Sequence, residues 1–141
     1  MNNKTNFKEK RIINGVQVDH SQVPYYVYLA GIGCGGSILN KEWILSAAHC
    51  GEGNFNLTGT EIYVGNTVAY DKSFTVLEQI IHENYDTPIS LNNDIMLLRV
   101  EITSDRDLLT YGKPVILPEQ DYELVNDLTG VICGTGSRNQ V

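Results

Sequence analysis

Residues 34–50 of the chain have the sequence CGGSILNKEWILSAAHC. Ser37–Leu39 and Trp43–Leu45 are short apolar runs that flank a polar turn at Asn40–Glu42, and this pattern predicts two neighbouring strands. The pair Gly35-Gly36 precedes the first run. Glycine lets one backbone approach another where a side chain would clash, so we expect a close approach there.

His49 stands at the end of this stretch, beside a cysteine. A bridge between Cys34 and Cys50 could hold the imidazole at a rigid corner between a strand and a loop. Such an imidazole can act as a general base, because it titrates near neutral pH. The alternative is an ordinary, partly buried histidine next to structural cysteines, and this stretch alone does not exclude it.

Residues 92–98, NNDIMLL, favour the interpretation of His49 as a base. Asp94 lies 45 residues after His49 and directly before an apolar run that predicts a strand. At the start of a strand its carboxylate is placed to point inward, where it needs a hydrogen-bond donor. An imidazole N–H is the natural donor for it.

Four stretches, in this order and at this spacing, make the chain resemble the chymotrypsin/trypsin-like serine proteases: Arg11–Gly15 (RIING), Cys34–Ser37 (CGGS), Ala47–Cys50 (AAHC) and Asn93–Leu98 (NDIMLL). The resemblance implies an all-β fold, with the N-terminal antiparallel Greek-key barrel of a double-barrel domain. It implies that His49 is the general base of a Ser-His-Asp triad and that Asp94 orients it. It also implies a Cys34–Cys50 disulfide.

The same resemblance assigns Arg11 and Ile12 to an activation cleavage site. Cleavage after Arg11 would release a new amino terminus on Ile12. In the family this ammonium pairs with an aspartate next to the nucleophilic serine. That aspartate has no counterpart in these 141 residues.

The family's nucleophile motif, Gly-Asp-Ser-Gly-Gly, is also absent from the 141 residues. Ser104 and Ser137 are the serines after Asp94, and neither lies in that context. Gly134–Ser137 resembles the family's Gly-Trp-Gly stretch, which opens the second barrel. We therefore expect a fragment whose second barrel is essentially missing and which by itself is inactive.

The expected domain organisation follows from these assignments. Residues 1–11 are predicted to be a disordered remnant of an activation peptide. Residues 12–141 are predicted to form a partial protease domain, with the first barrel at about 12–104 and the crossover and start of the second barrel at about 105–141. Further strands are predicted within 23–32 and at 61–65, 74–77 and 78–81. His20 is expected in a solvated loop.

Composition and charge constrain the compartment and the partners. The net charge of −7 argues against binding to nucleic acid or to an anionic membrane. The sequence contains no run of about 18 apolar residues, so it predicts no membrane-spanning helix. The first ten residues lack a signal-peptide core. A disulfide requires an oxidising compartment, so we expect a fragment, incomplete at both ends, of a secreted parent.

The resemblance implies protein or peptide substrates and protein protease inhibitors as its partners. Asn3 and Asn56 begin possible glycosylation sequons.

No cofactor and no metal are expected. Zinc held by Cys34, His49, Cys50 and His82 is disfavoured, because adjacent residues ligate one ion awkwardly. The short loop after Gly65 offers too few acidic oxygens for calcium. Three interpretations of Cys133 remain open: a shifted partner for a second-barrel cysteine, a buried free thiol, or a cysteine left unpaired by truncation.

One alternative function is a non-catalytic protease homologue that acts as a protein-binding module. Such a homologue is free to lose its catalytic side chains. The presence of both His49 and Asp94 therefore favours the enzyme.

Overall fold

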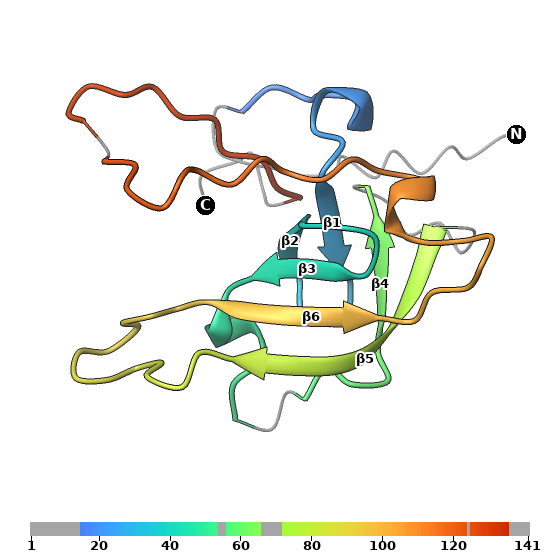
Figure 1. The fold of residues 1–141 in the computed structure, drawn as a ribbon, viewed down its shortest axis with the longest axis horizontal. Coiled ribbons are helices and arrows are strands. Elements are labelled where there is room, and N and C mark those ends of the chain that lie inside the picture. Colours follow the sequence, from blue (N-terminus) through green and yellow to red (C-terminus); the bar gives the residue numbers. More distant parts are fainter. Residues whose placement is uncertain (1–14, 54–55, 66–71, 124, 136–141) are drawn as a thin grey trace, which may run out of the picture.

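The structure, a computed structural model, describes residues 15–53, 56–65, 72–123 and 125–135. Its strands are β1 (Tyr26–Leu29), β2 (Cys34–Ile38), β3 (Trp43–Ser46), β4 (Glu61–Val64), β5 (Ser73–Ile81) and β6 (Met96–Val100). All neighbouring strands are antiparallel. They close into one barrel in the order β1-β2-β3-β6-β5-β4 (Figure 1). Strands β4, β5 and β6 are consecutive neighbours, and β6 returns to pair with β3, which precedes them in the chain. This arrangement is a Greek key. The predicted all-β Greek-key barrel is therefore confirmed.

The barrel core follows from alternation along the strands. In β6, Met96, Leu98 and Val100 are buried, and the residues between them are partly exposed. This period of two is that of a strand with one face on a core. The other strands add further fully buried large side chains: Val27, Leu29, Ile38, Ile44, Ile62, Val64, Phe74 and Val76.

The two glycines of the CGGS stretch lie where strands pack tightly. A Cβ atom on Gly36 would come within 2.8 Å of the Ile44 side chain and 2.9 Å of the Leu45 carbonyl oxygen. A Cβ on Gly35 would lie 2.8 Å from the ring of Tyr26. Any larger residue would push β1, β2 and β3 apart, so these glycines keep the beginning of β2 closely packed.

One strand prediction was wrong. Residues 74–77 and 78–81 were expected to form separate strands, but they belong to the single nine-residue strand β5. The register shifts between Val76 and Glu78, as in a β-bulge. The first part of β5 pairs with β4, whereas the later part pairs with β6. The bulge bends the strand, so one continuous segment serves two neighbours around the barrel.

Short 3₁₀ turns among the described residues include η1 (His20–Gln22), η2 (Ala48–Cys50) and η4 (Leu108–Thr110). No helix in the described ranges has the length and apolar character needed to cross a membrane. The expectation of a solvated loop for His20 was only partly correct, because the residue lies in η1 and its side chain is half-buried. Its Nε2 atom is buried without a hydrogen-bond partner, and its ring packs against Gly65 at the end of β4.

After η4 the chain runs back across one end of the barrel (Figure 1). The backbone N–H of Lys113 donates to the Pro24 carbonyl at 2.9 Å, and that of Val115 donates to the Ile38 carbonyl at 2.8 Å. Further on, the hydroxyls of Thr135 and Tyr26 lie 3.4 Å apart. These contacts fasten parts of the segment to β1 and β2.

Cys133 lies in the same segment and is a half-buried free thiol. Desolvation raises the pKa of Tyr25, and Cys133, which is hydrogen-bonded to it, raises it further.

Candidate active site

His49 lies in η2, the short turn that directly follows β3. A disulfide joins Cys50 to Cys34 at the start of β2, with the Cα atoms 6.3 Å apart. The bridge closes a loop whose ends are 16 residues apart. Closing a loop of this size stabilises the fold by about 3 kcal/mol in the chain-entropy model. The turn that carries His49 is thus tied covalently to the barrel.

Asp94 approaches His49 from the loop between β5 and β6, just before β6 begins. Its Oδ2 lies 2.7 Å from His49 Nδ1, and its Oδ1 accepts the backbone N–H of His49 at 2.9 Å. The two carboxylate oxygens therefore hold both the ring and the backbone of one residue. The side chains of Asp94 and His49 are 24% and 51% exposed, so the pair stands at the surface of the barrel.

The hydrogen bonds also control the charge of Asp94. Desolvation would by itself raise the pKa of Asp94, but hydrogen bonds from the side chain and backbone of His49 outweigh it and keep that pKa below its usual value. The backbone of Ala48 contributes in the same direction. Asp94 is therefore an anion at neutral pH, which is the state that can orient an imidazole.

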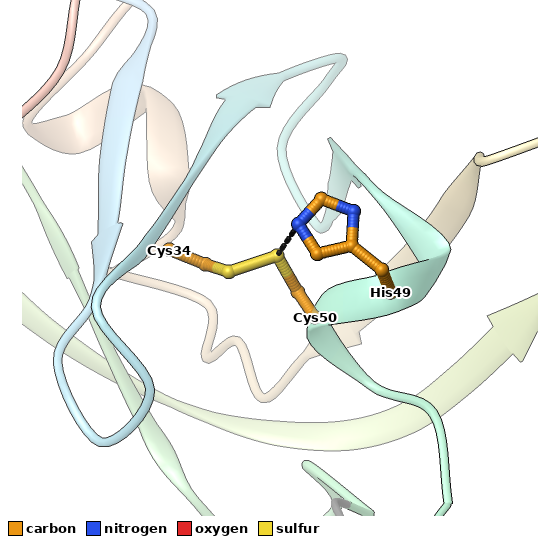
Figure 2. Close-up of side chains that lie close together, drawn as sticks. All are labelled: Cys34, His49 and Cys50. Atoms are coloured by element: carbon orange, nitrogen blue, oxygen red, sulfur yellow. Dashed lines mark hydrogen bonds between the residues drawn. A yellow bond between two sulfur atoms is a disulfide. The ribbon is translucent and has the colours of Figure 1, made fainter. Parts of the chain in front are cut away.

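The position of Asp94 determines which nitrogen of the imidazole is basic. Because the carboxylate faces Nδ1, this nitrogen carries the proton, and the lone pair of the neutral ring lies on Nε2. Nε2 lies 3.6 Å from Cys50 Sγ (Figure 2). A disulfide sulfur has no proton to donate, so this contact does not neutralise the base. The ring is arranged to accept a proton at Nε2 and to stabilise it through Asp94.

Asparagines before Asp94 shape its loop. Asn93 has a φ of 53°, in the left-handed region that asparagine tolerates better than most residues. Its side-chain amide donates to the Asn84 carbonyl at 3.0 Å, and that of Asn92 donates to the Thr87 carbonyl at 2.8 Å. The loop is thereby closed on itself, which fixes the direction in which the Asp94 carboxylate points.

Sequence reasoning missed two contacts that support the site. Tyr85 donates to Glu52, three residues after His49, with 2.5 Å between the oxygens. This hydrogen bond, with desolvation, raises the pKa of Tyr85 to about 12, so its hydroxyl remains a donor at neutral pH. Gln79 contacts the backbone of the same loop. Neither residue belongs to a motif, so no sequence signal indicated its role.

The other predicted residues are placed as follows. Arg11, Ile12, Asn3 and Ser137 lie outside the described residues. Asn56 is exposed, and its side-chain oxygen accepts the backbone N–H of Thr58 at 3.0 Å.

Ser104 does not reach His49. It follows β6, whereas Asp94 precedes that strand. Because β3 and β6 are antiparallel, with Ser46 opposite Met96, His49 lies at the Asp94 end of the pair. Ser104 therefore lies beyond the opposite end, where its hydroxyl donates to Asp105 at 3.1 Å.

Cys34, His49 and Cys50 form the cluster in the described ranges that resembles a metal site, with their ligand atoms within 4.8 Å of one another. Zinc binds cysteine as a thiolate. Here the two sulfurs are bonded to each other. In this state the cluster is a disulfide with a neighbouring imidazole, and its donor set does not fit zinc.

Known proteins match the chain over most of its length. It is 28% identical to kallikrein 1-related peptidase b22 of Mus musculus, over 94% of this chain and 54% of that protein. It is 31% identical to coagulation factor IX of Oryctolagus cuniculus, over 89% of this chain and 48% of the relative. It is 36% identical to serine protease 1 of Rattus norvegicus, over 78% of this chain and 44% of that protein. The chain thus spans about half the length of the curated relatives it matches. The family model described as Trypsin matches residues 12–141, and the chain belongs to the trypsin family of serine proteases.

Proposed function

We propose that this chain supplies the general base and the orienting carboxylate of a secreted serine endopeptidase. The observation that carries the proposal is the double contact of Asp94 with His49, at 2.7 Å to the ring and 2.9 Å to the backbone. A carboxylate placed in this way selects one tautomer of the imidazole and stabilises the imidazolium that forms during catalysis. The proposed substrates are peptide bonds in proteins.

In the proposed mechanism, His49 Nε2 takes the proton from the hydroxyl of an attacking serine. The serine oxygen bonds to the scissile carbonyl carbon, and His49 then gives the proton to the leaving amine, which leaves an acyl-enzyme. Water, deprotonated by the same nitrogen, hydrolyses the acyl-enzyme. Asp94 stays ionised throughout, in agreement with its lowered pKa.

The nucleophile of this mechanism is not among the 141 residues. They contain no Gly-Asp-Ser-Gly-Gly motif, and Ser104 lies beyond the far end of the β3–β6 pair. We therefore propose that the serine and its oxyanion hole come from sequence outside these residues, and that the 141-residue chain alone does not hydrolyse peptides. Cleavage at the proposed activation site, Arg11-Ile12, would take place in the same longer protein.

The decisive test is activity of the purified 141-residue chain on a broad fluorogenic peptide panel, with a serine-directed phosphonate probe alongside. We expect neither turnover nor labelling. Turnover with labelling, lost in His49→Ala, would place the nucleophile within this chain and contradict the proposal.

Reading the transcript beyond the Val141 codon separates the two classes of function. A Gly-Asp-Ser-Gly-Gly motif supports the peptidase, whereas another residue at the serine position supports a binding module.

Secretion and glycosylation form the second part of the proposal. The disulfide supports an oxidising compartment. Asn56 is exposed on its loop and so is accessible to modification. We expect the chain, expressed with a secretion signal in eukaryotic cells, to carry an endoglycosidase-sensitive glycan that Asn56→Gln reduces. Identical glycan content in the wild type and in Asn56→Gln would refute the assignment of Asn56.

A further inference from the structure

We infer that Gln79 is a positioning residue for His49, because its side-chain amide holds the segment that follows the η2 turn. This inference rests on the proposed role of His49 as the general base. Gln79 lies in β5, opposite Leu98 of β6, and its side chain is half-buried. Its amide reaches from the barrel wall to the loop after Cys50.

The contact uses both ends of the amide. Gln79 Nε2 donates to the Gly51 carbonyl at 2.8 Å, and Gln79 Oε1 accepts the backbone N–H of Leu57 at 2.9 Å. One side chain therefore joins two backbone groups that are six residues apart. A carboxylate could accept from Leu57 but could not donate to Gly51, and an aliphatic side chain could do neither. Glutamine meets both requirements at this distance from the strand.

Gly51 connects this contact to His49. It is the C-cap of η2, and its N–H donates to the Ala48 carbonyl at 2.9 Å. A Cβ atom on Gly51 would lie 2.7 Å from the sulfur of Met96 and 2.8 Å from Gln79 Nε2. The Gly51 backbone thus rests directly on Met96 and Gln79. A shift of Gly51 must shift the single turn that carries the imidazole.

His49 is consequently held from two directions. Asp94 binds its ring and its backbone N–H from one side. The disulfide and the Gln79 amide fix the chain immediately after it. Removing the amide contacts leaves the Asp94 carboxylate in place but loosens the end of η2. The distance from His49 Nδ1 to Asp94 Oδ2 should then fluctuate.

The test measures the His49–Asp94 hydrogen bond in the 141-residue chain, without any need for catalysis. An imidazole N–H bound to a carboxylate gives a low-field proton resonance that exchanges slowly with water. It is assigned here by its loss in His49→Gln. In Gln79→Leu we expect this proton to exchange at least about tenfold faster, because hydrogen bonds protect protons against exchange. Gln79→Glu, which keeps the acceptor for Leu57, should give an intermediate rate.

Val76→Ala is the matched control. Val76 lies in the same strand, is fully buried, and its side chain has no polar group. This substitution should lower the melting temperature yet leave the His49 proton protected under native conditions. If the exchange rate of the His49 proton rises in proportion to the loss of melting temperature in both Val76→Ala and Gln79→Leu, the positioning role is overturned. If Gln79→Leu does not fold, a wild-type exchange rate in folded Gln79→Glu would overturn it as well. Absence of the resonance from the wild-type chain would instead contradict the His49–Asp94 pair, and both proposals with it.

Discussion

The barrel and the segment that follows η4 differ in how far their apolar side chains are buried. In the barrel, residues 26–100, Leu98 and Val100 are almost completely buried. In the C-terminal segment, defined here as residues 112–135, Ile116 is 97% exposed and Ile132 is 85% exposed. No strand or helix occurs among the described residues of this segment.

The difference shows that apolar character alone does not bury a residue. Leu98 has a strand partner on each side, Ile44 in β3 and Gln79 in β5, and the closed barrel encloses its side chain. Val115 of the C-terminal segment donates a backbone hydrogen bond to Ile38, but this does not make the segment part of a sheet. We therefore expect the free energy of unfolding to come mainly from the barrel.

The largest expected effect comes from removing a core ring. Phe74 is 2% exposed in β5 and packs edge-to-face with Tyr111, with the ring centroids 6.2 Å apart. Phe74→Ala should reduce the free energy of unfolding by about 3–5 kcal/mol, because it removes buried surface and leaves a cavity. Urea denaturation followed by circular dichroism measures the change. A loss below about 1 kcal/mol would show that the barrel is not the main source of stability.

Removing the disulfide should have the next largest effect. Cys34→Ala/Cys50→Ala opens the loop that carries His49 and should cost about 3 kcal/mol in the same denaturation experiment. Cys133→Ser is the matched control, because this cysteine is free and lies in the C-terminal segment. It should change stability by no more than about 0.5 kcal/mol. An equal cost for both variants would mean that the segment unfolds as one unit with the barrel.

Acid should destabilise the barrel through His20. Burial lowers the pKa of His20, and Lys72 lowers it further, whereas the Tyr26 backbone and Asp19 act in the opposite direction. The unfolded chain therefore takes up this proton at a higher pH than the folded chain. The stability contributed by a neutral His20 is present above about pH 6.5 and is lost as the pH falls from there through the folded-state pKa.

Melting temperatures measured across this pH range test the expectation. His20→Gln should flatten the fall, because glutamine does not titrate. His82→Gln is the matched control, since His82 is an exposed histidine outside this contact. If His20→Gln and His82→Gln have the same pH profile as the wild type, the half-buried imidazole of His20 is not the origin of the acid sensitivity.

The smallest effect on stability is expected from the exposed residues of the C-terminal segment. Ile116→Ser/Ile132→Ser should leave the free energy of unfolding within about 0.5 kcal/mol of the wild type. It should nevertheless reduce self-association, because exposed apolar side chains promote contacts between copies. Size-exclusion chromatography with light scattering measures the mass. A monomeric wild type at high concentration would contradict the expected self-association.

Much of the fold was predictable because its signals are local. The alternation from Met96 to Val100 and the glycines beside Cys34 indicate strands and close packing within a few residues. The position of Asp94 before an apolar strand also predicted an imidazole as its partner. The division of β5 was mispredicted, since the bulge after Val76 resembles a break when only neighbouring residues are considered.

By itself, the sequence determined the all-β character, the family resemblance and the identity of the candidate pair His49 and Asp94. Only the tertiary structure decided that Gln79 reaches Gly51, that Tyr85 reaches Glu52 and that the half-buried ring of His20 packs against Gly65. The physical reason is that strand patterns depend on neighbours along the chain. The partner of a single amide, hydroxyl or imidazole depends instead on which backbone comes within about 3 Å once the barrel has closed.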